Sequence, residues 1–244
     1  MSYKVKINIL YNKQMQLLHS LFSFCVWELL TWSFERRDVG EDGITNFAEN
    51  VTSLTHALVT IALCYWILWA DPGNTELDHM YGHSDSAMVL FASSGGYFAW
   101  ELLTTLSSKN KVEWPFVLHA VVGTLCYMFA QYPYLHYYGV RFLLFELSTP
   151  FLNMMRLLPG SLYMPKLFVY TFVACRILYG VPLSYFFWQE SIELLRSGTQ
   201  HSAFVVVFCL LANIALNFLN FFWLCSIYYR IVGENKSKSK RNEQ

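Results

Sequence analysis

Six long apolar segments of this chain each carry one ionisable residue well inside the apolar run. A charge inside a lipid bilayer is costly, so such residues usually face the interior of a helix bundle or a wet cavity, and they often mark a functional site. One per segment predicts a shared polar interior. The six residues are Glu28, His56, Glu101, His119, Glu146 and Arg176.

Three of these residues have the chemistry of a general acid–base site. His56, Glu101 and His119 each lie about four or five residues from one end of their segments, which is roughly 6–8 Å into the membrane at about 1.5 Å per residue. Imidazole and carboxyl groups that lie close together can transfer protons, because burial and mutual interaction tune the pKa of each group. We predict that these three residues surround the mouth of a polar cavity, in which His119 is the general base and His56 and Glu101 tune or orient it. Structural interhelical hydrogen bonds remain the alternative for both histidines.

Glu146 and Arg176 lie deeper, about ten residues into their segments by the same measure. We expect them to pair near the midplane and to hold a cavity, either as a structural ion pair or as part of a site. The segment of Glu146 carries further polar residues at spacings of three and four, which share one helical face: Thr149, Asn153 and Arg156. Another segment presents a ladder of Asn213, Asn217 and Asn220, which can line a cavity or join helices.

The composition is that of a polytopic membrane protein. Of 244 residues, 55% are hydrophobic and 14% are charged, and the formal net charge of zero gives no sign of nucleic-acid binding. All six cysteines fall inside apolar segments and no CxxC spacing occurs, so we expect neither a disulfide framework nor a metal site. We also expect no cofactor.

The apolar pattern predicts an all-α membrane bundle of about seven transmembrane helices around a central, lipid-sized cavity. Helices are required because lipid cannot satisfy backbone polar groups. Pro150 and Pro182 predict kinks in the fifth and sixth spans. The predicted spans are 15–34, 51–70, 86–106, 115–132, 140–158, 166–189 and 203–230.

The distribution of lysine and arginine predicts the orientation. Lysine and arginine gather in or beside the loops that follow the first, third and fifth spans, and the C-terminal tail is basic, so the positive-inside rule places the C-terminus in the cytosol. The residues in or beside those loops are Arg36, Arg37, Lys109, Lys111, Arg156 and Lys166. Lysines near the N-terminus oppose this arrangement unless that segment lies on the membrane surface. We expect an N-terminal segment at 1–14, lumenal or membrane-surface, a first helix at 15–39, a six-helix domain at 40–232 and a disordered basic tail at 233–244.

Other seven-span proteins fit poorly. No Asp/Glu-Arg-Tyr follows the third span and no NPxxY lies in the seventh, which argues against a G-protein-coupled receptor. A retinal Schiff base would need an intramembrane lysine, and none occurs between Lys166 and Lys236. A transporter remains an alternative, although the sequence shows no inverted repeat with broken helices.

Three short motifs resemble the TLC-domain family, which includes ceramide synthases and translocon-associated membrane proteins. They are 53–57 (SLTHA), 96–102 (GYFAWEL) and 146–153 (ELSTPFLN), the last followed by Arg156. Their order over about 40–232, and the third motif above all, are similar to small TLC domain-containing proteins. Relatives often have Asp at the position of Glu101. Ceramide synthases carry paired histidines where this chain has only His119.

The resemblance implies a multi-pass protein of lipid homeostasis in the endoplasmic reticulum, binding a lipid or acyl chain in its bundle. Its natural partners would be membrane lipids, with homo- or hetero-oligomers as a further expectation. The single histidine favours binding over ceramide synthesis. One alternative is an acyltransferase with acyl-CoA as substrate and His119, His56 and Glu101 as its catalytic residues. Another is a non-enzymatic receptor or cargo adaptor of the same membrane.

Overall fold

The chain folds as a bundle of long helices. The computed structural model describes residues 3–35, 47–107, 113–130, 134–198 and 203–242, with side chains described for 15–34 of the first range and for 203–231 of the last. Within these ranges there is no strand, which confirms the predicted all-α class. The loops 36–46 and 108–112, whose arginines and lysines partly carry the predicted orientation, lie outside the described residues.

The described residues form seven successive helical segments. The fifth and the sixth segments each consist of three pieces, two α-helices with a short 3₁₀ or π segment between them. The elements are α1 (Tyr3–Glu35), α2 (Phe47–Ala70), α3 (Asp85–Ser107), α4 (Trp114–Phe129), α5 (His136–Leu143) with the 3₁₀ segment η1 (Leu144–Ser148) and α6 (Thr149–Leu157), α7 (Met164–Phe172) with the π-helical segment η2 (Val173–Tyr179) and α8 (Gly180–Ser197), and α9 (Ala203–Asn242).

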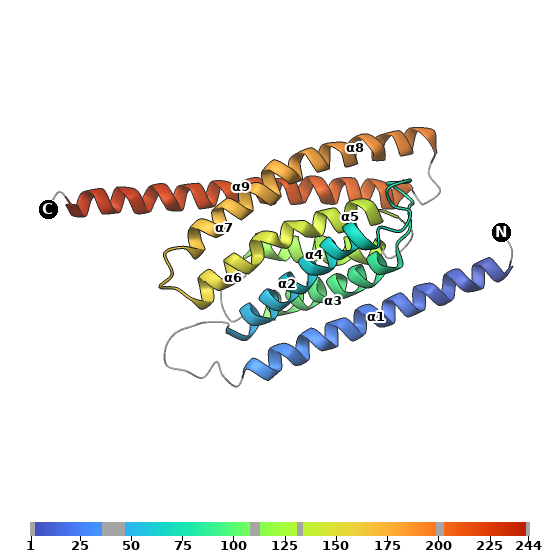
Figure 1. The fold of residues 1–244 in the computed structure, drawn as a ribbon, viewed down its shortest axis with the longest axis horizontal. Coiled ribbons are helices and arrows are strands. Elements are labelled where there is room, and N and C mark those ends of the chain that lie inside the picture. Colours follow the sequence, from blue (N-terminus) through green and yellow to red (C-terminus); the bar gives the residue numbers. More distant parts are fainter. Residues whose placement is uncertain (1–2, 36–46, 108–112, 131–133, 199–202, 243–244) are drawn as a thin grey trace.

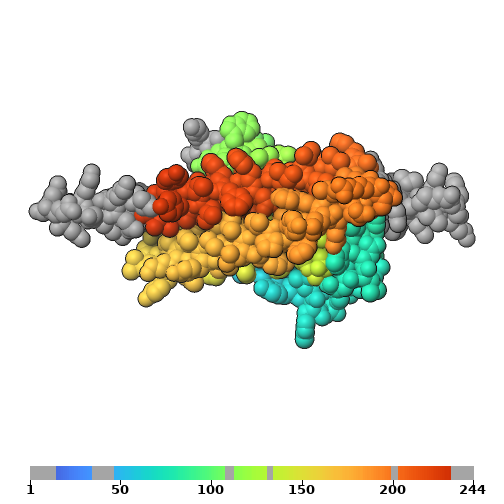
Figure 2. Space-filling view, turned by 90° about the horizontal axis from the view of Figure 1, so that it is seen from above, coloured from blue at the N-terminus to red at the C-terminus, as the bar shows by residue number. Residues whose placement is uncertain are grey.

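Successive segments run in opposite directions and pack side by side (Figure 1). α1 lies along α3 on one side of the bundle, α7–α8 and α9 cover the other side, and α2, α4, α5 and α6 lie between. Figure 2 shows α8 and α9 next to one another across the face that they cover. The start of α1 and the 71–84 loop are at one end of the bundle, and the last turns of α9 are at the other (Figure 1). This agrees with the prediction that the two ends of the chain lie on opposite sides.

Four segments are long and apolar enough to cross a membrane: Met15–Phe34, Phe47–Ala70, Met164–Ser197 and Ala203–Ile231. The described part of α4, Trp114–Phe129, is apolar but shorter. The integral membrane character is therefore supported, while the count of seven spans remains a prediction. Large apolar side chains on the outside of the bundle, such as Trp32, Trp66 and Phe218, have the exposure expected of a lipid-facing surface.

Both prolines mark interruptions of helical geometry. Pro150 occupies the first turn of α6 directly after η1, because proline fits the start of an α-helix but cannot continue one. Pro182 follows η2, where the backbone widens to π geometry. A proline cannot donate to the carbonyl one turn earlier, so the helix accommodates it by a local change of winding. The structure thus breaks the fifth and sixth spans in the parts of the chain where we expected kinks.

Two helix boundaries differ from those expected. α1 already begins at Tyr3 and α9 continues to Asn242, so helix extends through most of the segments expected at 1–14 and 233–244. Neither stretch contains proline, and Lys, Glu and Arg in the last one are good helix formers. Hydropathy predicts where a helix leaves the membrane. The helix itself can continue into water until residues that disfavour helix, such as proline or glycine, end it.

The interior packs in two apolar clusters. One joins α1, α2, α3 and α5 around residues such as Trp27, Phe91 and Trp100, and the other joins α5, α8 and α9 around Tyr138 and Phe187. α1 and α3 approach closely at Gly96, where an added Cβ would lie 2.6 Å from the backbone oxygen of Ser20. Small residues allow such backbone contact between membrane helices.

Candidate functional site

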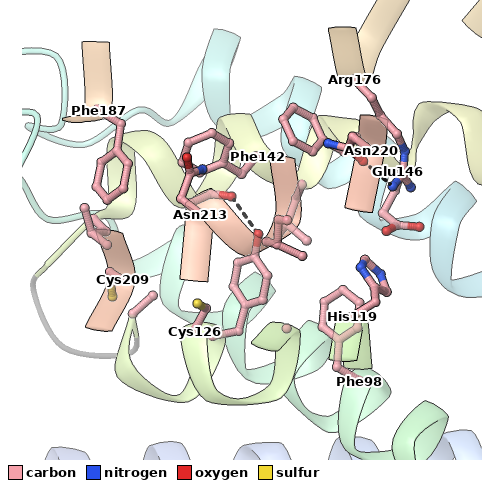
Figure 3. Close-up of a pocket in the computed structure, with 18 residues that line it drawn as sticks. Phe98, His119, Cys126, Phe142, Glu146, Arg176, Phe187, Cys209, Asn213 and Asn220 are labelled. Atoms are coloured by element: carbon pink, nitrogen blue, oxygen red, sulfur yellow. Dashed lines mark hydrogen bonds between the residues drawn. The ribbon is translucent and has the colours of Figure 1, made fainter. Parts of the chain in front are cut away.

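A cavity lies between α3, α4, α5–η1, η2–α8 and α9, in the half of the bundle away from α1 (Figure 3). Its volume is about 80 Å³. One water needs roughly 10–15 Å³ in this measure, so the cavity takes several water-sized groups. That is room for a segment of a chain or a small head group, and less than the lipid-sized cavity that the sequence suggested.

The cavity has a polar end and an apolar end. His119 from α4, Glu146 from η1, Arg176 from η2 and Asn220 from α9 gather at one end (Figure 3). The other end is lined mainly by apolar residues and thiols, among them Phe142, Phe187, Cys126 and Cys209. Asn213 lies there as well (Figure 3), but its Oδ1 already accepts hydrogen bonds from Trp188 and Asn217. Such a space is amphipathic, since hydrogen-bonding groups meet a ligand at one end and hydrocarbon meets it at the other.

Arg176 is held by neutral acceptors rather than by a carboxylate. Its Nε donates to Ser148 Oγ and one terminal nitrogen donates to Asn220 Oδ1, both at 3.2 Å. The guanidinium also lies 5.4 Å from the ring centre of Phe172 and 5.7 Å from that of Trp223, within reach of cation–π attraction. Among the described residues no ion pair joins Arg176 to Glu146, which corrects our expectation of a direct pair.

The bond from Arg176 determines which way the Asn220 amide faces. A guanidinium only donates, so the oxygen of Asn220 must be turned toward it and the amide nitrogen away from it. This nitrogen is buried and has no hydrogen-bond partner among the described residues. Asn220 is 2% exposed. An unpartnered buried donor is costly, so a ligand or water that accepts from it would stabilise the site.

His119 offers a second unused polar atom. Its ring lies edge-on to Phe98 and Trp223, with ring centres 5.6 and 5.7 Å away. Its Nδ1 is buried and, within the described chain, has no hydrogen-bond partner. Aromatic packing thus fixes the imidazole while one nitrogen remains available to a ligand.

The asparagine ladder of α9 has two roles. Asn217 donates to Ser184 Oγ at 2.9 Å, and Trp188 Nε1 donates to Asn213 Oδ1 at 2.8 Å, so both residues tie α9 to α8. Asn213 and Asn220 also line the cavity, and Asn217 does not. Helix pairing and cavity lining, which the sequence left as alternatives, therefore occur along one helix face.

His56 lies outside this cavity. Its ring stacks on Tyr97 with ring centres 3.6 Å apart, its Nε2 is 3.1 Å from Thr60 Oγ1, and Trp27 meets it edge-on. Glu101, on the same helix as Tyr97, is half-buried and does not line the cavity either. Of the predicted acid–base group only His119 is in the cavity wall.

The remaining polar residues of the fifth segment form a separate network. Ser53 Oγ of α2 accepts hydrogen bonds from Tyr97 of α3 at 3.0 Å and from Asn153 of α6 at 2.9 Å. One turn further along α6, Arg156 lies 3.4 Å from Asn50 Oδ1, and its side chain is exposed. Thr149 begins α6 and is half-buried, and its side chain is not part of these hydrogen bonds. This network joins three helices and lies beside His56 rather than in the cavity.

Sequence reasoning missed several residues of these sites. Ser53, Ser148, Tyr97 and Trp223 carry no charge and stand out by no local pattern, although the first three fall within the motifs quoted above. Glu28, which opened the series of ionisable residues, is exposed on α1. No group of three or more His, Cys, Asp or Glu side chains in the described part of the chain is placed to hold a metal ion.

Comparisons with known proteins agree with this architecture. The family model described as TLC domain matches residues 46–229. An uncharacterized TLC domain-containing protein of Schizosaccharomyces pombe is 33% identical over 204 residues, covering 79% of this chain and 69% of the relative. A similar uncharacterized protein of Saccharomyces cerevisiae is 28% identical over 72% of this chain and 60% of its own length. TLC domain-containing protein 4-B of Danio rerio is 23% identical over 89% of this chain and 88% of its own.

Proposed function

The chain belongs to the TLC-domain family, and from this premise we propose that it is a multi-pass membrane protein of lipid homeostasis that binds a lipid or acyl chain inside its helix bundle. One observation carries the proposal: a cavity between the helices with unpartnered hydrogen-bonding groups at one end and mainly apolar side chains at the other. The sidedness matches an amphiphile, whose polar part would meet His119 and Asn220 and whose chain would lie toward Phe187.

The location we propose is the endoplasmic reticulum, with the C-terminus in the cytosol. The polar end of the cavity lies toward the half of α4 that starts at Trp114. Among the described residues, Arg156 in the last turn of α6 and Lys166 in the first turn of α7 lie at that end of the bundle (Figure 1). A ligand with a polar group would then enter or present that group from the cytosolic half of the membrane.

Lipid that stays with the purified protein tests the binding. The protein is extracted in a mild detergent, and bound lipid is quantified by mass spectrometry for the wild type and for Cys209→Phe. Cys209 lines the apolar end and is 4% exposed, so a phenyl ring there fills the cavity. We expect bound lipid to fall several-fold. Cys225→Phe is the matched control, because Cys225 lies on the same helix and is exposed. Equal loss in both variants, or no retained lipid in the wild type, would contradict the proposal.

A catalytic version rests on one further observation, the unpartnered Nδ1 of His119 in the cavity wall. In acyl transfer from acyl-CoA, this nitrogen would take the proton of an acceptor hydroxyl or amine as that group attacks the thioester carbonyl. The thiolate of coenzyme A would leave and then receive the proton. An acyl-CoA transfer assay on purified wild type and His119→Ala tests this version, and equal rates at matched folding would remove His119 from any catalysis.

A further inference from the structure

The polar end of the cavity also indicates what kind of head group it accepts. Resting on the lipid-binding function proposed above, we propose that the ligand is an uncharged amphiphile whose head group carries a hydroxyl or an amide, such as a monoacylglycerol or a long-chain alcohol. Fatty-acid anions, cationic amines and phospholipids would bind less well. Three features of the cavity support this: its charges, its unused hydrogen-bonding atoms and its size.

The formal charges in the cavity wall cancel. Arg176 and Glu146 are the two side chains of its lining that are ionised in their ordinary state at neutral pH, and both are more than nine-tenths buried. The other titratable lining groups, His119, Tyr127 and the thiols, are mostly uncharged at that pH in ordinary surroundings. A charged head group would leave the lining side chains and the ligand together with a net charge, which is costly in an apolar environment, whereas an uncharged one would not.

The unused atoms call for a group that both accepts and donates. Asn220 Nδ2 is a donor without a partner, and His119 Nδ1 is a second unpartnered atom. Glu146, at the same end, contributes a carboxylate that can only accept when ionised. A hydroxyl can accept from Asn220 and donate to His119 or Glu146, and an amide can do the same. A carboxylate or phosphate lacks the donor and would face Glu146.

Arg176 does not supply an obvious anion site. Two of its nitrogens already donate to Ser148 and Asn220, and the rings of Phe172 and Trp223 flank it. An arginine that recognises an anion usually presents two parallel N–H groups to it. The volume of about 80 Å³ points the same way, because it has room for a small head group or a segment of a chain, and a phospholipid head group with two chains is far larger.

Competition among lipids with the same chain separates these head groups. The full-length protein in nanodiscs is cross-linked with a monooleoylglycerol that carries a diazirine in its chain, and the labelled peptides are identified by mass spectrometry. Unlabelled monooleoylglycerol, oleate, oleylamine and oleoyl lysophosphatidylcholine serve as competitors. We expect labelling of lining peptides of α4, α5 and α9, with monooleoylglycerol protecting at concentrations at least about tenfold lower than any charged or zwitterionic competitor.

The outcomes separate the two proposals. If oleate, oleylamine or the lysophospholipid prevents labelling of the lining peptides at concentrations as low as monooleoylglycerol does, the head-group inference is overturned. Lipid binding itself would then still stand. Absence of labelling in these peptides, for a protein that is folded, would overturn both.

A single charge change supplies an independent test. Glu146→Gln keeps the size of the side chain but leaves Arg176 without a compensating charge in the cavity wall. The preference for monooleoylglycerol over oleate should fall by about tenfold, because an anion would now neutralise the site. Glu193→Gln makes the same change at an exposed position of α8 and should leave the preference as in the wild type. An unchanged preference in folded Glu146→Gln would overturn the charge argument.

Discussion

Arg176 donates a hydrogen bond to the side-chain oxygen of Asn220 at 3.2 Å, and this contact joins the π-helical segment η2 to α9. A buried arginine in a membrane helix would ordinarily be expected to meet a carboxylate. Here neutral acceptors and aromatic rings surround it, and Glu146 shares the cavity without forming an ion pair with it among the described residues. The arrangement leaves the cavity with two opposite charges and with a free amide N–H.

Arg176→Lys should destabilise the protein although it keeps the charge. Lysine cannot donate at once to Ser148 and Asn220 in the geometry of the guanidinium fork. Leaving a buried acceptor without its donor costs about 1–3 kcal/mol. Thermal unfolding in detergent, followed by thiol reactivity or fluorescence, should show a lower midpoint. Arg196→Lys, at an exposed position of α8, is the control and should unfold as the wild type does. Equal midpoints for the two variants would contradict the structural role.

Ser53→Ala should loosen the contact between α2, α3 and α6. Ser53 Oγ accepts from both Tyr97 and Asn153, which are 2% and 1% exposed, so its loss leaves two buried donors without an acceptor. We expect a loss of about 1–3 kcal/mol of unfolding free energy. Ser226→Ala is the control, because that exposed hydroxyl only bonds to its own helix. The double variant Ser53→Ala/Asn153→Ala should cost less than the sum of the single variants, and strict additivity would show that the two side chains do not interact.

Substitution of His119 should reduce lipid binding, whereas substitution of His56 should not. His119→Phe removes the free Nδ1 from the cavity wall, and bound lipid should fall several-fold. His56→Phe should leave bound lipid unchanged, because His56 does not line the cavity and a phenyl ring can still stack on Tyr97. Bound lipid is measured by mass spectrometry at equal amounts of folded protein. A loss in His56→Phe that matches the loss in His119→Phe would show that the two residues act at one site after all.

Two exposed leucines at opposite ends of the bundle test the orientation. Leu77 in the 71–84 loop is 91% exposed and Leu162 between α6 and α7 is 80% exposed. With the C-terminus in the cytosol, Leu162→Cys in sealed microsomes should react with a membrane-impermeant maleimide. Leu77→Cys should react only after the membrane is opened. Background labelling is read from the wild type, whose six cysteines lie in helices. The reverse labelling pattern would show that the C-terminus is on the lumenal side.

Much of the fold could be predicted from the sequence because the signals are local. Long apolar runs require helix in lipid, and proline at 150 and 182 interrupts helices whatever surrounds it. The spacing of Asn213, Asn217 and Asn220 places them on one face of α9, as the structure has them. The helix ends at 3 and 242 escaped the prediction, because hydropathy reports membrane depth rather than the end of a helix.

The sequence by itself determined which residues share a helix face, since this follows from the helical period, and the helical rise gives a predicted depth for each. Only the tertiary structure decided which face meets which neighbour. His56 and His119 were expected at one depth, yet the first stacks on Tyr97 between α1, α2 and α3, and the second lines a cavity beside α9. Helix rotation and the choice of partner arise from packing between segments far apart in the chain, and no local pattern encodes them.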